Sequence, residues 1–147
     1  MNHTGYPYEY VCEIRFRDID GMGHLNNAVY FTYMESARIH FIADLLETSE
    51  LNQLGIILGE ISCRYLSPAV FGESVAVGQA VTRFGTKSFD LEYQLVAVDR
   101  SGATGRKLAQ GKATLVGYDY ANQCSAVVPE FLKEKIRQQQ PNWPIRE

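Results

Sequence analysis

The sequence has no long apolar run, no excess of positive charge and no leader-like start. No hydrophobic stretch approaches the roughly 20 residues that a membrane-spanning helix needs, so we expect no membrane segment. The net charge is −3, which argues against nucleic acid or an anionic membrane surface as a partner. Residues 1–10 lack both the basic and the apolar section of a secretory signal, and we therefore expect a cytoplasmic protein.

Cysteine is scarce, and the motifs of several enzyme classes are absent. The three cysteines, Cys12, Cys63 and Cys124, lie far apart and form no Cys-x-x-Cys pair, so we expect them to be reduced and structural. No spacing of histidine, cysteine or carboxylates is typical of a metal site, and we expect neither metal nor cofactor. A Gly-x-Ser-x-Gly elbow is also missing, which argues against a serine hydrolase.

The most informative stretch is residues 15–30, where a strand pattern stops at a dense polar turn. Alternating side chains before it predict a strand over about 8–17. The turn, 18–27, holds two carboxylates, two glycines and a histidine, and Asn26 or Asn27 supplies an N-cap for the helix that follows. A carboxylate beside a helix N-terminus lies near unpaired N–H groups, so one turn can supply both the base and the oxyanion site of acyl-group hydrolysis.

No glycine or proline interrupts the chain between Ala28 and about Leu46, which predicts one long helix. Its apolar residues cover more than one stripe, so we expect protein on most sides of the helix, with Met34, Phe41 and Leu45 in the core.

The rest of the chain predicts mainly strands, over about 56–66, 74–84, 88–99 and 104–118, and a short helix over about 129–139. Short glycine-containing turns join the last three strands, as in an antiparallel meander. One apolar helix followed by a long sheet favours an α+β fold in which the sheet wraps the helix. Because such a sheet leaves an open edge, we expect self-association.

The motif Asp-x-Asp-x-x-Gly-His-x-Asn-Asn-x-x-Tyr-x-x-Tyr-x-Glu-x-Ala-Arg, from Asp18 to Arg38, resembles the signature of hotdog-fold acyl-CoA thioesterases of the 4-hydroxybenzoyl-CoA thioesterase type. Residues 61–68 and 83–89 also resemble that family, and the similarity spans about 8–118. The resemblance implies a single hotdog domain over 1–147 that acts on acyl-CoA or acyl-carrier-protein thioesters, as a homodimer or a dimer of dimers.

The resemblance also implies roles for individual residues. The catalytic carboxylate falls on Asp20, as a nucleophile or as a general base, and both routes stay open. A backbone N–H at the helix start, that of Asn27 or a neighbour, would hold the thioester oxygen. Further candidates for contacts with the substrate, including the phosphates or pantetheine of CoA, are Tyr30, Arg64, Lys87 and Ser88.

Three further polar residues of the motif have two interpretations each. His24 resembles a catalytic histidine of plant acyl-carrier-protein thioesterases, but Met22 replaces the asparagine that accompanies it there, so a structural role is equally open. Glu35 resembles an acidic residue that other hotdog thioesterases place across a subunit interface, and an ion pair with Arg38 is the alternative. For Asp18 we favour a structural pair with a nearby arginine, Arg15 or Arg17, over a catalytic role.

Two rival functions share the fold. A hotdog dehydratase or hydratase would carry a His-Phe-Pro segment or a Gly-Asp-x-Asn-Pro-x-His motif, and the chain has neither. A non-catalytic acyl-CoA sensor would usually be fused to a DNA-binding region, for which we expect no room in 147 residues.

Overall fold

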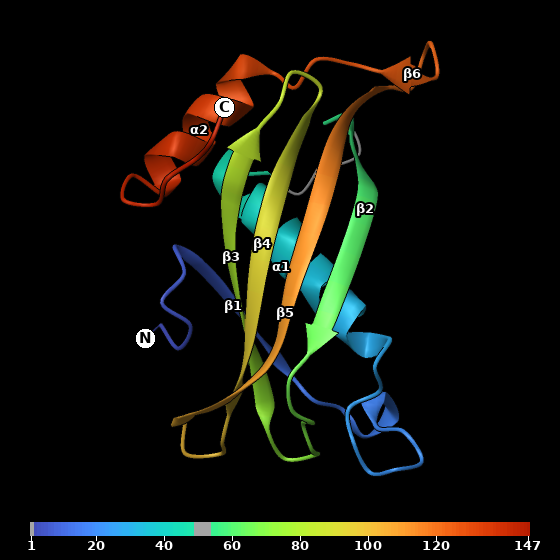
Figure 1. Ribbon diagram of the computed structural model, residues 1–147, viewed down its shortest axis with the longest axis vertical. Helices are drawn as coiled ribbons and strands as arrows, with labels where there is room; N and C mark the ends of the chain where they lie inside the picture. The colour runs from blue at the N-terminus through green and yellow to red at the C-terminus, as the bar shows by residue number, and fades with distance from the viewer. Residues whose placement is uncertain (1, 49–53) are drawn as a thin grey trace.

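The computed structural model describes residues 2–48 and 54–147. Along the chain they form β1 (Tyr8–Glu13), the 3-10 helix η1 (Phe16–Asp18), α1 (Val29–Leu46), β2 (Ile56–Tyr65), β3 (Ser74–Phe84), β4 (Ser88–Val98), β5 (Thr104–Asp119), β6 (Cys124–Ser125) and α2 (Glu130–Gln139). The long strands form one antiparallel sheet in the order β1-β3-β4-β5-β2, and the short β6 pairs with the end of β5 (Figure 1). Within these residues no helix is long and apolar enough to cross a membrane.

The helix α1 crosses one face of the sheet (Figure 1). Side chains from both elements form the core. Alternate residues of the central strands point at the helix and are buried. They include Val75, Val77 and Val81 of β3, Leu91, Tyr93 and Leu95 of β4, and Ala109, Ala113 and Leu115 of β5. The predicted hotdog fold, a long antiparallel sheet wrapped around one helix, is therefore confirmed.

The long helix runs unbroken from Val29 to Leu46, as predicted. Met34 and Phe41 are buried in the core, and Leu45 is half-buried against it. The expectation that protein covers most sides of the helix is wrong for this single chain, because Thr32, Glu35, Ile39 and His40 remain exposed. The sheet covers only one side of the helix. Ile39 on the other side is 43% exposed, so part of an apolar side chain remains uncovered there among the described residues.

The predicted ion pair between Glu35 and Arg38 does not form. Arg38 is buried and donates a hydrogen bond from Nη1 to the phenol oxygen of Tyr93 in β4, at 3.2 Å. Glu35 is exposed and has no ion pair in the described ranges. The two side chains leave the helix in different directions, one toward the sheet and one toward solvent, which separates their charges.

The first strand ends earlier than predicted. The alternation of side chains continues to Phe16, but β1 stops at Glu13 and residues Phe16–Asp18 turn as η1. The cause is the Asp18 carboxylate, which accepts a hydrogen bond from the Arg15 backbone N–H at 3.0 Å and so closes a turn. Phe16 is left 81% exposed. The other predicted strands and α2 agree with the observed bounds to within two residues.

The C-terminal segment seals one edge of the sheet. β1 pairs only with Ser74–Gln79 of β3, which leaves the second half of β3 open on that side. The buried Gln140 amide fills the gap: its Oε1 accepts from the Val81 N–H at 3.0 Å and its Nε2 donates to the Val81 carbonyl oxygen at 2.8 Å. Arg146 then exchanges backbone hydrogen bonds with Thr82 and Phe84. No such cover is found on the free edge of β2 among the described residues.

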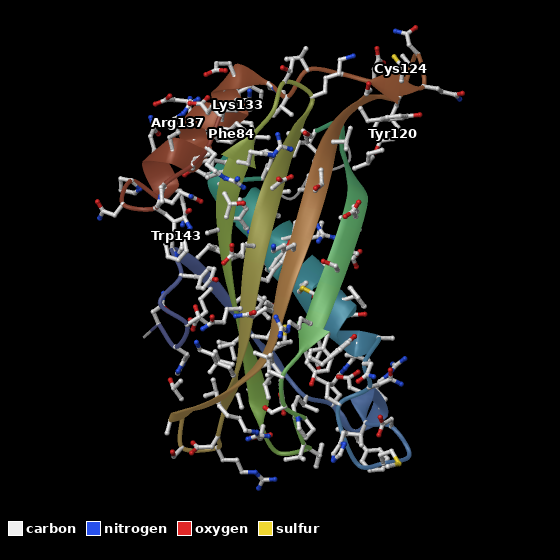
Figure 2. All side chains as sticks on the ribbon, in the orientation of Figure 1. Phe84, Tyr120, Cys124, Lys133, Arg137 and Trp143 are labelled. Carbon is white, nitrogen blue, oxygen red and sulfur yellow. The ribbon has the colours of Figure 1, made fainter. Side chains whose placement is uncertain are left out.

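The helix α2 is fixed to the same end of β3. Leu132 and Ile136 are buried, and Lys133 and Arg137 lie over the ring of Phe84, at 5.5 and 5.1 Å from its centroid (Figure 2). These cation–π contacts and buried leucine and isoleucine side chains position Gln140, which follows the helix directly.

We predict that Gln140→Ala lowers the free energy of unfolding by about 2 kcal/mol or more, because it leaves the buried N–H and C=O of Val81 unpaired. Gln138→Ala, two residues earlier on the exposed side of α2, is the matched control and should change it by less than about 0.5 kcal/mol. Urea unfolding of both variants gives the comparison. Equal stability of the two variants would contradict the sealing role of Gln140.

Candidate active site

The turn before α1 is anchored by the buried carboxylate of Asp18, which is 3% exposed. Besides the Arg15 N–H, it accepts hydrogen bonds from Nε and Nη2 of Arg15, at 3.2 and 3.1 Å, and from the phenol of Tyr33 in α1, at 2.7 Å. Burial by itself would raise the pKa of Asp18, but the hydrogen bonds from Arg15 and Tyr33 outweigh it and lower the pKa. Asp18 is thus structural, and its partner is Arg15 rather than Arg17.

Asp20 organises the tip of this turn. Its Oδ1 accepts hydrogen bonds from the backbone N–H groups of Met22, at 2.8 Å, and His24, at 3.2 Å. The backbones of Asp20 and His24 are also bonded, at 2.8 Å, and Gly23 adopts the positive φ of 81° that the reversal requires. The second carboxylate oxygen, Oδ2, has no hydrogen bond within the described residues. Asp20 therefore has one oxygen fixed by the turn and one oxygen free to react.

The Asn27 N–H, beside this turn, is unpaired at the start of α1 among the described residues. Asn26 accepts twice: its carbonyl oxygen takes the Val29 N–H and its Oδ1 takes the Ala28 N–H, both at 2.9 Å. The Asn27 N–H has no partner in the part of the chain that the structure describes. Because a trans peptide is planar, this N–H points opposite to the Asn26 carbonyl, which points into the helix. Asn27 thus presents an outward N–H at the positive end of the helix dipole.

The predicted N-cap differs in detail from the observed one. The N-cap position of α1 is Ala28, which has no capping side chain, and Asn26 supplies the side-chain acceptor two residues before it. The asparagine that caps the turn is therefore Asn26, and Asn27 keeps both its N–H and its side chain toward solvent.

A cleft of about 410 Å³ opens over these groups. It is lined by Asp20, Met22, His24, Leu25, Asn27, Tyr30, Tyr65, Leu66, Ser67 and Pro68. Tyr30 is buried at its base and meets the ring of Tyr65 edge to face, with centroids 4.9 Å apart. The cleft lining therefore includes a carboxylate with one oxygen unbonded and a residue with an unpaired N–H, as far as the structure describes the chain, beside aromatic and aliphatic side chains. This combination suits an apolar group attached to a reactive carbonyl.

The cleft wall formed by residues 65–68 is held by a nearby ion pair that the sequence did not suggest. Arg106 of β5 forms two parallel hydrogen bonds with Glu73, at 2.8 and 2.9 Å, and donates to the Pro68 carbonyl oxygen at 2.6 Å. The hydrogen bonds from Arg106 lower the pKa of Glu73. The adjacent Ala69 carbonyl oxygen accepts the Leu25 N–H at 2.8 Å, which joins this wall to the Asp20 turn.

The chain brings Asp20, His24, Asn27 and Tyr30 together, but not the other predicted site residues. Glu35 points to solvent from α1, and Arg64 is exposed on β2 next to Tyr65, so the alternation of the strand directs it to the opposite face. Lys87 and Ser88 lie at the β3–β4 turn, at the end of the sheet opposite the turn 18–27 (Figure 1). The Ser88 hydroxyl there accepts a hydrogen bond from Arg83 at 3.1 Å.

Cysteine and metal chemistry find no support at this cleft. Cys63 is half-buried in β2 without a lining position, and burial raises the pKa of its thiol, which disfavours the nucleophilic thiolate. No group of three histidines, cysteines or carboxylates suited to a metal ion occurs among residues 2–48 and 54–147.

Comparison with known proteins gives consistent matches over most of the chain. Residues 14–136 match the model of the thioesterase-like superfamily. A thioesterase from Thermus thermophilus, solved in complex with coenzyme A and Zn, is 30% identical, covers 95% of this chain and 98% of its own, and superposes with a TM-score of 0.81.

A more distant protein shares the fold, and another relative matches in sequence. The 4-hydroxybenzoyl-CoA thioesterase from Pseudomonas sp. strain CBS-3 is 14% identical, with a TM-score of 0.75 over 86% of this chain and 96% of its own. The uncharacterized protein YsmA of Bacillus subtilis (strain 168) is 28% identical over 90 residues, 61% of either chain, so the match spans about three-fifths of that relative's length.

The Asp18 network predicts a pH-dependent stability. Asp18→Asn should lower the free energy of unfolding at pH 7 by about 2 kcal/mol, because it removes charged hydrogen bonds from a buried site. A carboxyl whose pKa is lowered in the folded state stabilises the fold above its unfolded pKa, and the stabilisation is lost as pH falls through the folded pKa.

The difference between wild type and Asp18→Asn should therefore shrink between about pH 5 and pH 2, as measured by urea unfolding. Arg17→Gln is the control, because Arg17 is exposed and has no ion pair in the described part of the chain. A difference that stays constant with pH would show that the Asp18 charge is not what anchors the turn.

Proposed function

Since this chain belongs to the thioesterase-like superfamily of thioester hydrolases, we propose that it cleaves acyl-CoA to free CoA and a carboxylic acid at the Asp20 cleft. One observation carries the proposal: Asp20, whose Oδ2 has no hydrogen bond among the described residues, and Asn27, whose N–H has no partner there, line the same cleft. A nucleophile or base beside a preorganised N–H is what addition to a thioester carbonyl needs.

The Asn27 N–H receives the charge that develops on the carbonyl oxygen. As the carbonyl carbon becomes tetrahedral, its oxygen turns into an oxyanion, and the N–H and the helix dipole stabilise it. The Asn27 side chain is not needed for this step, because the donor belongs to the backbone. Its function depends instead on the hydrogen bonds of Asn26, which fix the first turn of α1.

Asp20 acts by one of two routes that use the same oxygen. As a base, it takes a proton from water while the water oxygen bonds to the carbonyl carbon, after which the C–S bond breaks and the CoA thiolate takes up a proton. As a nucleophile, it forms a mixed anhydride and releases the thiolate, and water then hydrolyses the anhydride. His24 lines the cleft beside Asp20 and positions the substrate or the water in either route.

The distribution of the remaining candidate residues points to a homo-oligomer. Lys87 and Ser88 lie at the opposite end of the sheet from Asp20 (Figure 1). They therefore contact a CoA bound at the cleft only if they come from another subunit. Antiparallel pairing of two β2 strands across their free edges would bring the opposite ends of two sheets together. Glu35, on the exposed side of α1, would then face the second subunit, together with Arg64 at the adjoining edge.

The Asp20→Asn variant tests the catalytic assignment. The amide keeps an oxygen that accepts the N–H groups of Met22 and His24, so the turn and the affinity for acyl-CoA should be preserved. The amide is neither a base nor a nucleophile, and we expect kcat for thiol release to fall by about 10²–10⁴-fold. The assay is thiol release from a panel of aromatic, short-chain and long-chain acyl-CoAs.

Asp18→Asn is the matched control, two residues away in the same turn, and should reduce the melting temperature more than turnover per folded molecule. Wild-type turnover by Asp20→Asn across the whole panel would refute the assignment. Retained acyl-CoA binding without any turnover by the wild-type protein would instead favour a sensor.

We predict a mass of at least twice 16.6 kDa in static light scattering at micromolar concentration. Leu58→Asp, at an exposed position of β2, should weaken the association, because it places a charge in the proposed interface. Phe131→Asp, at an apolar position of α2 that is also exposed, should leave the mass unchanged. A wild-type monomer, or equal effects of both variants, would refute the pairing through β2.

A further inference from the structure

Tyr65 makes a hydrogen bond between the sheet and the N-terminus of α1. It is the last residue of β2, and its phenol donates to the Asn27 carbonyl oxygen at 2.6 Å. Its ring packs edge to face on Tyr30, the second residue of α1, which fixes the direction of the phenol. Tyr65 and Asn27 are 38 positions apart in the sequence, so their hydrogen bond depends on how β2 lies against α1.

The hydrogen bond completes the fixation of both peptide groups that flank the Asn27 Cα. The peptide before it is held through the Asn26 carbonyl, which accepts the Val29 N–H. The peptide after it is held at both ends: its N–H, from Ala28, donates to Asn26 Oδ1, and its carbonyl oxygen accepts the Tyr65 phenol. With both planes fixed, the direction of the Asn27 N–H is fixed as well.

We propose that Tyr65 is a positioning residue of the hydrolysis reaction, which acts through Asn27 by fixing the N–H that receives the oxyanion. The inference rests on the proposed function, because it assumes that the Asn27 N–H is the oxyanion donor. Such donors accelerate a reaction because they are oriented before the charge develops, and a donor on a loosely held peptide loses that advantage. The phenol thus contributes to kcat without contacting the reacting atoms.

The Tyr65 phenol remains a hydrogen-bond donor over the whole pH range in which the enzyme works. Burial raises the pKa of Tyr65, so its proton stays in place at neutral and mildly alkaline pH. Loss of the phenol should consequently lower kcat by the same factor at every pH at which the enzyme works. A residue that transferred a proton in the reaction would instead change the shape of the pH profile.

Tyr65→Phe is the test, since it removes the donor and keeps the ring against Tyr30. We expect kcat for thiol release to fall by about 10-fold to 10²-fold, the range for a reacting geometry that is loosened by a fraction of an ångström. KM should change by less than about twofold, because the wall of the cleft is unchanged. The backbone N–H of Ala28 should also exchange faster with solvent deuterium.

Tyr8→Phe is the matched control. Tyr8 of β1 likewise tethers a strand to α1 through its phenol, which donates to Asp44 at 2.8 Å near the other end of the helix. The Tyr8→Phe variant removes an equivalent hydrogen bond far from the cleft. It should therefore lower stability to a similar extent, while kcat and the hydrogen exchange rate of the Ala28 N–H stay at wild-type values.

The outcomes separate this inference from the proposed function. If Asp20→Asn is inactive but Tyr65→Phe keeps wild-type kcat and Ala28 exchange, the positioning role is refuted and the proposed function stands. If Tyr65→Phe and Tyr8→Phe lower kcat equally, Tyr65 is only a structural tether. If Asp20→Asn is fully active, the proposed function fails, and with it the reaction that Tyr65 would serve.

Discussion

The geometry of the cleft depends on one buried carboxylate, that of Asp18. The carboxylate accepts four hydrogen bonds from Arg15 and Tyr33, and the backbone carbonyl oxygen of Asp18 accepts the Asn26 N–H at 2.9 Å. The strand β1, the turn and the helix α1 are thereby tied to a single group. Asp20 lies two residues after Asp18, and Asn27 directly follows Asn26. Both therefore belong to the turn that Asp18 anchors. The two aspartates of the motif thus have different proposed roles: the buried Asp18 holds the turn, and Asp20 is available for the reaction.

Much of this could be predicted from the sequence, because it depends on local patterns. The uninterrupted apolar segment indicated the bounds of α1, and alternation indicated the strands. The two arginines near Asp18 indicated a structural pair but did not decide between Arg15 and Arg17. Contacts between distant residues left no such signal. Arg38 binds Tyr93, 55 residues away, instead of the neighbouring Glu35, and Gln140 pairs with Val81, 59 residues away. Tyr65 lay within a segment that the sequence singled out, yet its bond to Asn27 depends on the packing of β2 on the helix.

The residues that we propose a second subunit supplies could not be placed from local sequence patterns either. Within the described residues, one edge of the sheet is covered by Gln140 and Arg146, and the other edge, β2, is uncovered. Because the cleft adjoins the end of β2 at Tyr65, a second copy at this edge would border the substrate. Arg64, Lys87, Ser88 and Glu35 remain predictions that only such an assembly can satisfy, whereas Asp20 and Asn27 meet within one chain.

The most direct test is a crystal structure of Asp20→Asn with a bound acyl-CoA, which the variant should hold without cleaving. The account predicts that the thioester carbonyl oxygen accepts a hydrogen bond from the Asn27 N–H at about 2.7–3.1 Å, with the residue 20 amide beside the carbonyl carbon. A thioester bound with its carbonyl away from the start of α1, or outside this cleft, would contradict it.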